Sequence, residues 1–318
     1  MEILVIGGSG FIGTRLVDEL LSANHKVRIL DINPSLKYPE LTTLGDVRNL
    51  NDIVSASQDI DVIYNLAAEH RDDVKPVSLY EEVNVDGARN VVDAAISNNV
   101  NAIVFTSSVA IYGLNKNCPD ETFPAEPFNE YGRTKWEAEK IFNEWASSDP
   151  TRNLTIIRPA VVFGEGNRGN VYNLMSQIQS GKFIMIGDGT NRKSMGYVGN
   201  IAALLSQMIN NKGVCIFNFC DKPDLTSAEI TKFISKNMGK SLPRFHIPLF
   251  FGILAGRAID MIAATTNKNY SISEVRIRKF VAETTVSTEK LINNNYKQKY
   301  TIYQGLSRMI DSEFPPTE

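Results

Sequence analysis

The sequence is poor in the side chains that build metal sites and disulfide frameworks. Its 318 residues include only three cysteines and three histidines. The cysteines (Cys118, Cys215 and Cys220) are odd in number, and no group of Cys and His has the spacing of a metal site. We therefore predict reduced thiols, no bound metal and a cytoplasmic location.

The chain also lacks a large excess of charge of either sign. Its formal net charge is −3, and hydrophobic and charged residues make up 43% and 22% of the sequence. These are the proportions of an ordinary soluble protein. Because the chain is not basic, there is no electrostatic basis for binding nucleic acid, and we expect no such partner.

An uninterrupted hydrophobic run of bilayer length is missing as well. The chain opens directly on a strand-like segment, so we expect no signal peptide. The most apolar stretch, Phe245–Ala264, is interrupted by Arg257 and Asp260, and its apolar run is shorter than a bilayer requires. We predict no integral membrane segment and interpret this stretch as a helix of the substrate-binding part. Contact with a membrane surface is the alternative.

What the sequence does contain is a glycine-rich turn between an apolar run and a helix-like stretch. This turn, Gly7–Gly13, has the order of a βαβ unit that binds a dinucleotide. Gly7 allows a tight turn, Gly10 leaves room for a pyrophosphate against the backbone, and Gly13 lets the helix pack closely on the sheet. The unpaired N–H groups at the start of that helix would bind the phosphates.

An acidic residue at the end of the second apolar run indicates which dinucleotide is bound. The carboxylate of Asp31 can accept hydrogen bonds from both ribose hydroxyls of NAD, and it would repel the 2′-phosphate of NADP. Asn33 and Pro34, which follow, supply no cation for that phosphate. The predicted cofactor is therefore NAD.

Strand-like and helix-like segments alternate through the first half of the chain. Strands are expected at residues 3–6, 27–30, 62–65, 102–106 and 154–158. This alternation predicts an α/β fold with a Rossmann-type, doubly wound parallel sheet and right-handed crossovers. We predict an NAD-binding Rossmann domain at residues 1–165, which a strand near 214–219 rejoins. A smaller mixed C-terminal substrate lobe would occupy mainly residues 166–318.

Two side chains four residues apart suggest the chemistry. Tyr131 and Lys135 begin a helical segment and share one face of it. The ammonium is expected to lower the pKa of the phenol, which would make it a base near neutral pH, and to bond the nicotinamide ribose. Ser108 follows the strand-like run 102–106 and can hydrogen-bond the same substrate oxygen as Tyr131. We predict these three as catalytic residues.

Taken together, these motifs resemble the extended short-chain dehydrogenases/reductases of the NAD-dependent epimerase/dehydratase family, which acts on nucleotide-activated sugars. The resemblance extends over most of the chain. Its segments are Gly7–Gly13, Asp31, Gly45–Val47, Asn65–Ala68, Asn84–Gly87, Thr106–Gly113, Tyr131–Lys135 and Arg158–Gly164.

The resemblance implies further site residues. The cofactor site would comprise Gly7, Gly10, Phe11, Ile12, Gly13, Asp31, Asp46, Val47, Ala67, Tyr131, Lys135 and Pro159. The substrate site would comprise Ser108, Asn170, Arg192, Lys193 and Arg276, with Arg278 as a further candidate. Cations among these would meet the diphosphate of a UDP- or GDP-linked sugar. A surface position without a ligand is the alternative for each residue after Ser108. The resemblance also implies a homodimer.

One departure from the family pattern narrows the reaction. Val109 and Ala110 stand where sugar 4,6-dehydratases of this family carry an Asp-Glu pair, and neither side chain can transfer a proton. We therefore expect an NAD-dependent nucleotide-sugar epimerase, acting at C4 through a 4-keto intermediate. A nucleotide-sugar 4-reductase or dehydrogenase using NAD(P) is the alternative. A non-catalytic dinucleotide-sensing protein is disfavoured, because it would not need the intact catalytic set.

Overall fold

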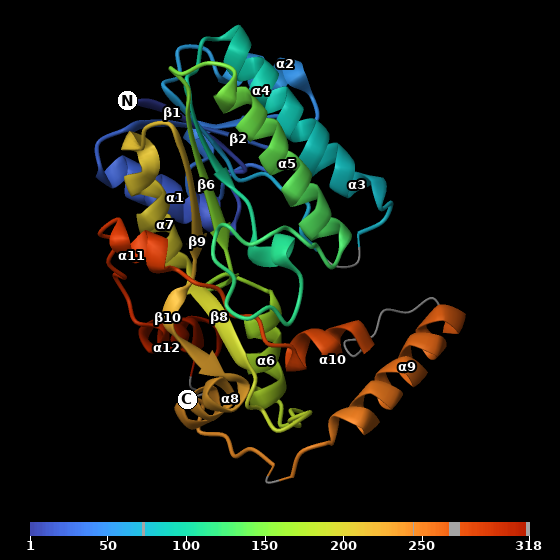
Figure 1. Ribbon diagram of the computed structural model, residues 1–318. Helices are drawn as coiled ribbons and strands as arrows, with labels where there is room; N and C mark the ends of the chain where they lie inside the picture. The colour runs from blue at the N-terminus through green and yellow to red at the C-terminus, as the bar shows by residue number, and fades with distance from the viewer. Residues whose placement is uncertain (72–73, 244, 267–273, 316–318) are drawn as a thin grey trace.

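The computed structural model describes residues 1–71, 74–243, 245–266 and 274–315. A seven-stranded parallel sheet in the order β3-β2-β1-β4-β5-β6-β9 forms its centre (Figure 1). Its strands are β1 (Glu2–Ile6), β2 (Lys26–Asp31), β3 (Thr42–Leu44), β4 (Val62–Asn65), β5 (Ala102–Thr106), β6 (Asn153–Pro159) and β9 (Val214–Phe219). The predicted doubly wound sheet is confirmed, including the late strand that rejoins it.

Helices cover both faces of this sheet, which explains why its central strands are apolar on both sides. One face is packed by α1 (Phe11–Ser22) and α7 (Val198–Gln207), whose side chains share a core cluster with β1 and β4. The other face is covered by α2 (Leu50–Ala56), α4 (Gly87–Ser97) and α5 (Glu130–Ser147). A short helix, α3 (Ser78–Tyr80), and a π-helical segment, η2 (Glu81–Asp86), lead into α4.

A smaller lobe is built around a three-stranded sheet in the order β10-β8-β7. Its strands are β7 (Val161–Phe163), β8 (Arg192–Tyr197) and β10 (Asp221–Thr226), and β8 pairs antiparallel with β10 but parallel with β7. Three helices pack with these strands in one apolar cluster: α6 (Asn170–Gln179), α8 (Ser227–Asn237) and α12 (Ile302–Glu313).

The later helices of the chain differ in how they are placed. Helix α11 (Glu289–Asn293) lies against the main sheet, since Leu291 belongs to the same core cluster as α1 and α7. In contrast, α9 (Leu249–Thr266) extends away from the body of the molecule, with α10 (Glu274–Val281) beside it (Figure 1). Within the described ranges, no helix combines the length and apolarity needed to cross a membrane.

The parallel arrangement of the main sheet determines where a ligand can bind. The carboxyl ends of β1, β4, β5 and β6 meet at one edge, and the segments that follow them begin there. Open α/β sheets bind ligands at this edge. The predicted glycine turn and Ser108 both lie on it, after β1 and β5 respectively.

Candidate active site

The glycine turn after β1 is crowded by backbone. Gly7 has a φ of +80°, and a Cβ there would lie 2.8 Å from the backbone nitrogen of Ala67. A Cβ on Gly13 would lie 2.3 Å from the carbonyl oxygen of Gly7. A side chain at either position would collide with these backbone atoms, so only glycine fits. The two glycines therefore allow α1 to begin directly against the turn. The bare backbone that results is the surface expected to face a pyrophosphate.

Three buried polar atoms at or beside the same sheet edge lack hydrogen-bond partners among the described residues. They are the Ser9 hydroxyl, the side-chain carbonyl of Asn65 and the Thr106 hydroxyl, which follow or end β1, β4 and β5. A buried polar atom without a partner costs free energy. A cofactor with phosphates, ribose hydroxyls and an amide fits this edge, because it offers partners to such atoms.

Asp31 connects the glycine turn to the next loop. Its carboxylate accepts hydrogen bonds from the backbone N–H of Ser9 (3.0 Å) and of Asn33 (3.0 Å). Its own carbonyl oxygen accepts from Gly45 N–H at 3.0 Å, which brings the segment containing Asp46 and Val47 alongside. The structure therefore groups these predicted cofactor residues around the end of β2, where an NAD ribose is expected.

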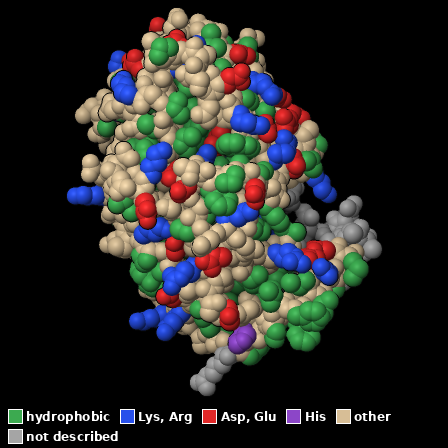
Figure 2. Space-filling view, viewed as in Figure 1, with side chains coloured by type: hydrophobic (Ala, Val, Ile, Leu, Met, Phe, Trp, Pro, Cys, Tyr) green, Lys and Arg blue, Asp and Glu red, His purple; other side chains and the backbone are tan. Residues whose placement is uncertain are grey.

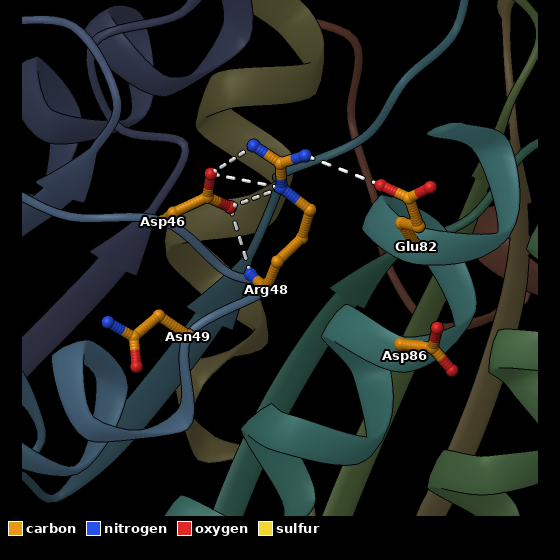
Figure 3. A pocket seen from close by; sticks show the side chains of 5 residues that line it. All are labelled: Asp46, Arg48, Asn49, Glu82 and Asp86. Atoms are coloured by element: carbon orange, nitrogen blue, oxygen red, sulfur yellow. Dashed lines mark hydrogen bonds and ion pairs between the residues drawn. The ribbon is translucent and has the colours of Figure 1, made fainter. Parts of the chain in front are cut away.

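A polar pocket lies beside Asp46 (Figure 3). Its lining residues are Asp46, Arg48, Asn49, Glu82 and Asp86. The guanidinium of Arg48 points between two carboxylates, 2.6 Å from Asp46 and 3.4 Å from Glu82. Its hydrogen bonds lower the pKa of Asp46, which is therefore ionised at neutral pH. We expect adenine to bind next to this pocket.

The start of α5 is held tightly against the turn that follows Ser108. Asn129 caps the helix by accepting the Gly132 N–H at 2.9 Å. A Cβ on Gly132 would lie 2.5 Å from the carbonyl oxygen of Ala110. Ser108 caps that same turn by accepting the Ala110 N–H at 3.1 Å. This packing brings Tyr131 and Ser108 together, close enough for the Ser108 hydroxyl to act on the pKa of the phenol.

The pKa of Tyr131 differs from the prediction. Burial raises it, and the hydrogen bond from Ser108 opposes that shift only in part. The predicted lowering of this pKa by Lys135 is therefore wrong. The Lys135 ammonium instead lies over the ring of Phe105, 4.2 Å from the ring centroid. The main cause of the shift is desolvation, which depends on the tertiary fold.

Lys135 is itself strongly affected by its surroundings. Only 1% of the residue is exposed, and burial lowers its pKa to about 7. The opposing influence is the carboxylate of Glu139, which lies one helical turn further along α5 and is fully buried. Tyr131, Lys135 and Glu139 thus follow one another on a single helix face.

Glu139 belongs to a buried network that the sequence reasoning missed. Arg158 donates to it from Nε (3.0 Å) and Nη2 (2.7 Å), and the Ser107 hydroxyl donates to it as well. Arg158 also donates to the Tyr112 hydroxyl at 2.7 Å. The signal that could have found it is the carboxylate four residues after Lys135, on the same face of a helix.

Asn84 links the opposite side of the site. Its side-chain oxygen accepts from Glu69 N–H at 2.8 Å, and its amide donates to the Thr134 hydroxyl at 2.9 Å. It is buried and lies in the π-helical segment η2, a geometry common at functional sites. Asn84 therefore ties the loop after β4 to the helix that carries Tyr131 and Lys135.

The predicted substrate cations lie in the smaller lobe. The Lys193 ammonium on β8 donates to the carbonyl oxygen of Lys279 at 2.8 Å and to that of Ala282, and burial lowers its pKa to about 8. The neighbouring Arg192 guanidinium donates to the carbonyl oxygen of Asp224 at 3.0 Å. Both residues thus support the backbone of their lobe, and their binding of a diphosphate stays a prediction.

The other substrate candidates are more dispersed. Arg276 and Arg278 lie on α10, the helix whose end Lys193 holds, and Arg278 forms an ion pair with Glu274 at 2.8 Å. Asn170 is the first residue of α6 and is exposed. The structure therefore brings Lys193 and α10 together. The roles of Asn170 and of the two arginines in binding substrate stay predictions.

Comparison with known proteins identifies the family of this chain. The model of the NAD dependent epimerase/dehydratase family matches residues 3–219. The chain is 47% identical to an N-acetyl-α-D-glucosaminyl-diphospho-ditrans,octacis-undecaprenol 4-epimerase of Escherichia coli O157:H7, over 98% of this chain and 95% of that protein. It is 28% identical to a UDP-glucose 4-epimerase of Vibrio cholerae, over 85% and 88% of the two chains.

The fold has well-matched solved relatives. The UDP-glucose 4-epimerase of Thermus thermophilus, in complex with NAD, superposes with a TM-score of 0.78 over 98% of both chains, at 21% identity. The predictions of fold, of NAD as cofactor and of an epimerase are confirmed by these comparisons together. The chain belongs to the NAD-dependent epimerase/dehydratase family.

Proposed function

We propose that this protein is a 4-epimerase for an N-acetylhexosamine that is attached through a diphosphate to a polyprenyl lipid. The observation that carries the proposal is the 47% identity, over nearly the full length of both chains, to an enzyme named for such a substrate. The proposal refines the predicted nucleotide sugar: the sugar and the diphosphate are kept, and the nucleoside is replaced by a lipid.

The residues at the sheet edge can carry out the first step. The Tyr131 phenolate would take the proton of the C4 hydroxyl, and the Ser108 hydroxyl would donate a hydrogen bond to the same oxygen. Lys135 would hold the nicotinamide ribose and so place the cofactor beside Tyr131. The NAD held there would supply a reversible hydride acceptor for C4. Tyr131 would return the proton to the same oxygen at the end of the reaction, when the configuration at C4 has been inverted.

The surroundings of Ser108 support an epimerase over a dehydratase. Val109 and Ala110 follow it in the short helical turn η3 (Val109–Tyr112), and neither side chain can accept or donate a proton. Elimination of water would need an acid and a base at this position. The chemistry available is therefore proton transfer at one hydroxyl and hydride transfer at its carbon.

A UDP-sugar 4-epimerase is the second candidate. A UDP-glucose 4-epimerase of Lactobacillus helveticus is 30% identical over 84% of this chain and 89% of that protein. Both candidates share the catalytic residues and the diphosphate. They differ in what is attached to the second phosphate, which the smaller lobe would have to recognise. The predicted homodimer is compatible with either and stays a prediction.

A direct test compares the two substrates with the same purified protein. N-acetylglucosaminyl-diphospho-undecaprenol in detergent micelles and UDP-N-acetylglucosamine would each be incubated with a catalytic amount of NAD. The sugar is then released by mild acid and separated from its 4-epimer by chromatography. We expect kcat/KM to be about 100-fold or more higher for the lipid-linked sugar, since a lost recognition element of this size costs about 3 kcal/mol. Conversion of the UDP-sugar alone would refute the proposal.

A further inference from the structure

The outer part of the smaller lobe exposes apolar side chains in one place. Six large ones are exposed between residues 245 and 261: Phe245, Leu249, Phe250, Phe251, Leu254 and Met261. Phe250 and Phe251 are 67% and 61% exposed. Figure 2 shows a green patch at the lower right, where Figure 1 places α9. A contiguous apolar surface of this kind marks a binding face.

Helix α9 has the opposite orientation to an ordinary surface helix. Its closest packing is made by glycine: a Cβ on Gly252 would lie 2.7 Å from Ile186, and one on Gly256 would lie 2.8 Å from the backbone of Glu274, at the start of α10. Arg257 and Asp260 also bind Glu274, through an ion pair at 2.8 Å and a hydrogen bond from its backbone N–H at 3.0 Å. The two glycines are four residues apart, so they share one face of the helix. The bulky side chains, including Phe250 and Leu254, are left on the exposed side. An ordinary surface helix turns its large apolar side chains toward the protein and its small or polar side chains toward water.

Basic side chains border this apolar face. The described residues 245–261 and 274–281 contain four basic and two acidic side chains, a net charge of +2 in a chain of net charge −3. These are Arg257, Arg276, Arg278 and Lys279 against Asp260 and Glu274. In Figure 2 blue side chains lie along the upper edge of the green patch. Apolar side chains next to cations are complementary to the surface of an anionic bilayer.

The same region is attached to the part of the lobe expected to meet the diphosphate. Lys193 holds the end of α10 through the carbonyl oxygens of Lys279 and Ala282, and Thr284 N–H donates to the carbonyl oxygen of Arg192 at 3.1 Å. The apolar face is thus continuous, through α10, with the two predicted diphosphate ligands. A substrate whose lipid stays in the bilayer would enter from this side.

We infer that the face formed by residues 245–261 and α10 docks on an anionic lipid bilayer, with α9 lying in the plane of the interface. This inference rests on the proposed function, which places the substrate in a membrane. An α9 of 18 residues is about 27 Å long and lies along the surface with its phenylalanines among the acyl chains. Arg278 and its basic neighbours contact the headgroups.

Vesicle binding by the full-length protein tests this without any substrate. Co-sedimentation is measured with vesicles of phosphatidylcholine alone and with vesicles containing one quarter phosphatidylglycerol. The wild type is expected to bind the anionic vesicles more tightly, and added salt should weaken that binding. The double variant Phe250→Ser/Phe251→Ser should lose about 30-fold or more in partition coefficient, because two phenylalanines no longer enter the apolar layer.

A matched control keeps the result specific. Val214 and Ile292, on β9 and α11, are also exposed apolar residues, at 47% and 54%. The variant Val214→Ser/Ile292→Ser should bind vesicles like the wild type. Equal binding by the Phe250/Phe251 variant, or equal loss in both variants, would overturn the inference. A third result would also overturn it: the wild type does not bind vesicles but forms a dimer, and the Phe250/Phe251 variant is monomeric. A second copy of the chain would then cover the face.

The outcomes separate this inference from the proposed function. A protein that binds anionic vesicles through α9 but converts only UDP-sugars would refute the proposed substrate and leave the docking face standing. A protein that converts the lipid-linked sugar but does not bind vesicles would refute the docking face alone. The Phe250/Phe251 variant should convert the substrate in detergent micelles at the wild-type kcat, because neither residue belongs to the catalytic site.

Discussion

The carboxyl edge of the main sheet and the outer face of α9 break the usual rule of burial in opposite directions. At the sheet edge, the charged side chains of Lys135, Glu139 and Arg158 are buried. On α9, the large apolar side chains of Phe250 and Phe251 are exposed. Each arrangement costs free energy in the isolated protein. This difference fits the ligands that we propose for the two regions: a polar ligand at the sheet edge and an apolar one at α9.

The helices of the two regions, α5 and α9, also differ in how firmly they are held by the rest of the molecule. Helix α5, which carries Tyr131 and Lys135, is fixed by a cap, by a glycine contact with Ala110 and by the buried ion pair between Glu139 and Arg158 (2.7 Å). Helix α9 packs through Gly252 and Gly256, and an exposed ion pair between Arg257 and Glu274 at 2.8 Å joins it to α10. Changes at the sheet edge should therefore affect chemistry and stability strongly, whereas changes on the exposed side of α9 should affect neither.

The largest effect is expected from Tyr131→Phe. Without the phenol there is no group to take the C4 hydroxyl proton, so kcat should fall about 1,000-fold or more. Binding of NAD, followed by tryptophan fluorescence, and the melting temperature should change little. Tyr303→Phe, at a half-exposed position on α12, is the matched control and should keep full activity. An active Tyr131→Phe enzyme would remove the phenolate from the mechanism.

Lys135→Met should stabilise the protein while it abolishes activity. The pKa of Lys135 is about 7 when folded, against 10.5 for an ordinary lysine, so burying its charge costs stability. The cost is fully present below pH 7 and disappears as the pH rises through 10.5. The free energy of unfolding of the variant should therefore exceed that of the wild type by up to about 4 kcal/mol at pH 6.

Urea titrations at several pH values between 6 and 10 measure this gap. It should shrink by about 1.4 kcal/mol per pH unit above pH 7. Lys140→Met, at an exposed position on the same helix, serves as the control. Its free energy of unfolding should be close to that of the wild type at every pH. A Lys135→Met variant that is less stable than the wild type at pH 6 would contradict the assigned cost.

Gly132→Ala should have an intermediate effect on both properties. The added methyl group would lie 2.5 Å from the carbonyl oxygen of Ala110, so the start of α5 must move away from the Ser108 turn. We expect kcat to fall about 10- to 100-fold, because Tyr131 and Ser108 are then out of position. Stability should fall by about 1 to 3 kcal/mol. Steady-state kinetics and urea unfolding measure the two effects, and unchanged values in both would contradict this account of the packing.

The smallest effect on stability is expected for Phe250→Ser/Phe251→Ser. Both side chains are mostly exposed, so their loss should change the free energy of unfolding by no more than about 0.5 kcal/mol. Urea unfolding in the absence of lipid measures this. A loss of several kcal/mol would show that the two phenylalanines support the fold, and the contrast between the two regions would disappear.

Local sequence spacing was enough to predict the fold and the cofactor. The glycine turn, Asp31 and the Tyr131/Lys135 pair are short patterns whose physical reasons act within a few residues. Strand β9 was also predicted, from its apolar run. Strand β3, at three residues, was too short to give a pattern and was missed.

Features that depend on tertiary contacts were not accessible in the same way. The ion pair of Glu139 with Arg158 joins residues 19 positions apart, and the direction of the Tyr131 pKa shift depends on burial by the rest of the fold. The apolar stretch that contains α9 was correctly interpreted as a helix. Which of its faces would be covered depends on where Gly252 and Gly256 pack, and periodicity alone does not contain that information.

Isotope retention tests the central claim most directly. N-acetylglucosaminyl-diphospho-undecaprenol with deuterium at C4 would be converted by the enzyme in ordinary water with a catalytic amount of unlabelled NAD. If a hydride leaves C4 and returns to the same carbon within one site, mass spectrometry of the released 4-epimer should show the deuterium retained at C4. Replacement of that deuterium by solvent hydrogen, or a requirement for stoichiometric NADH, would contradict the account.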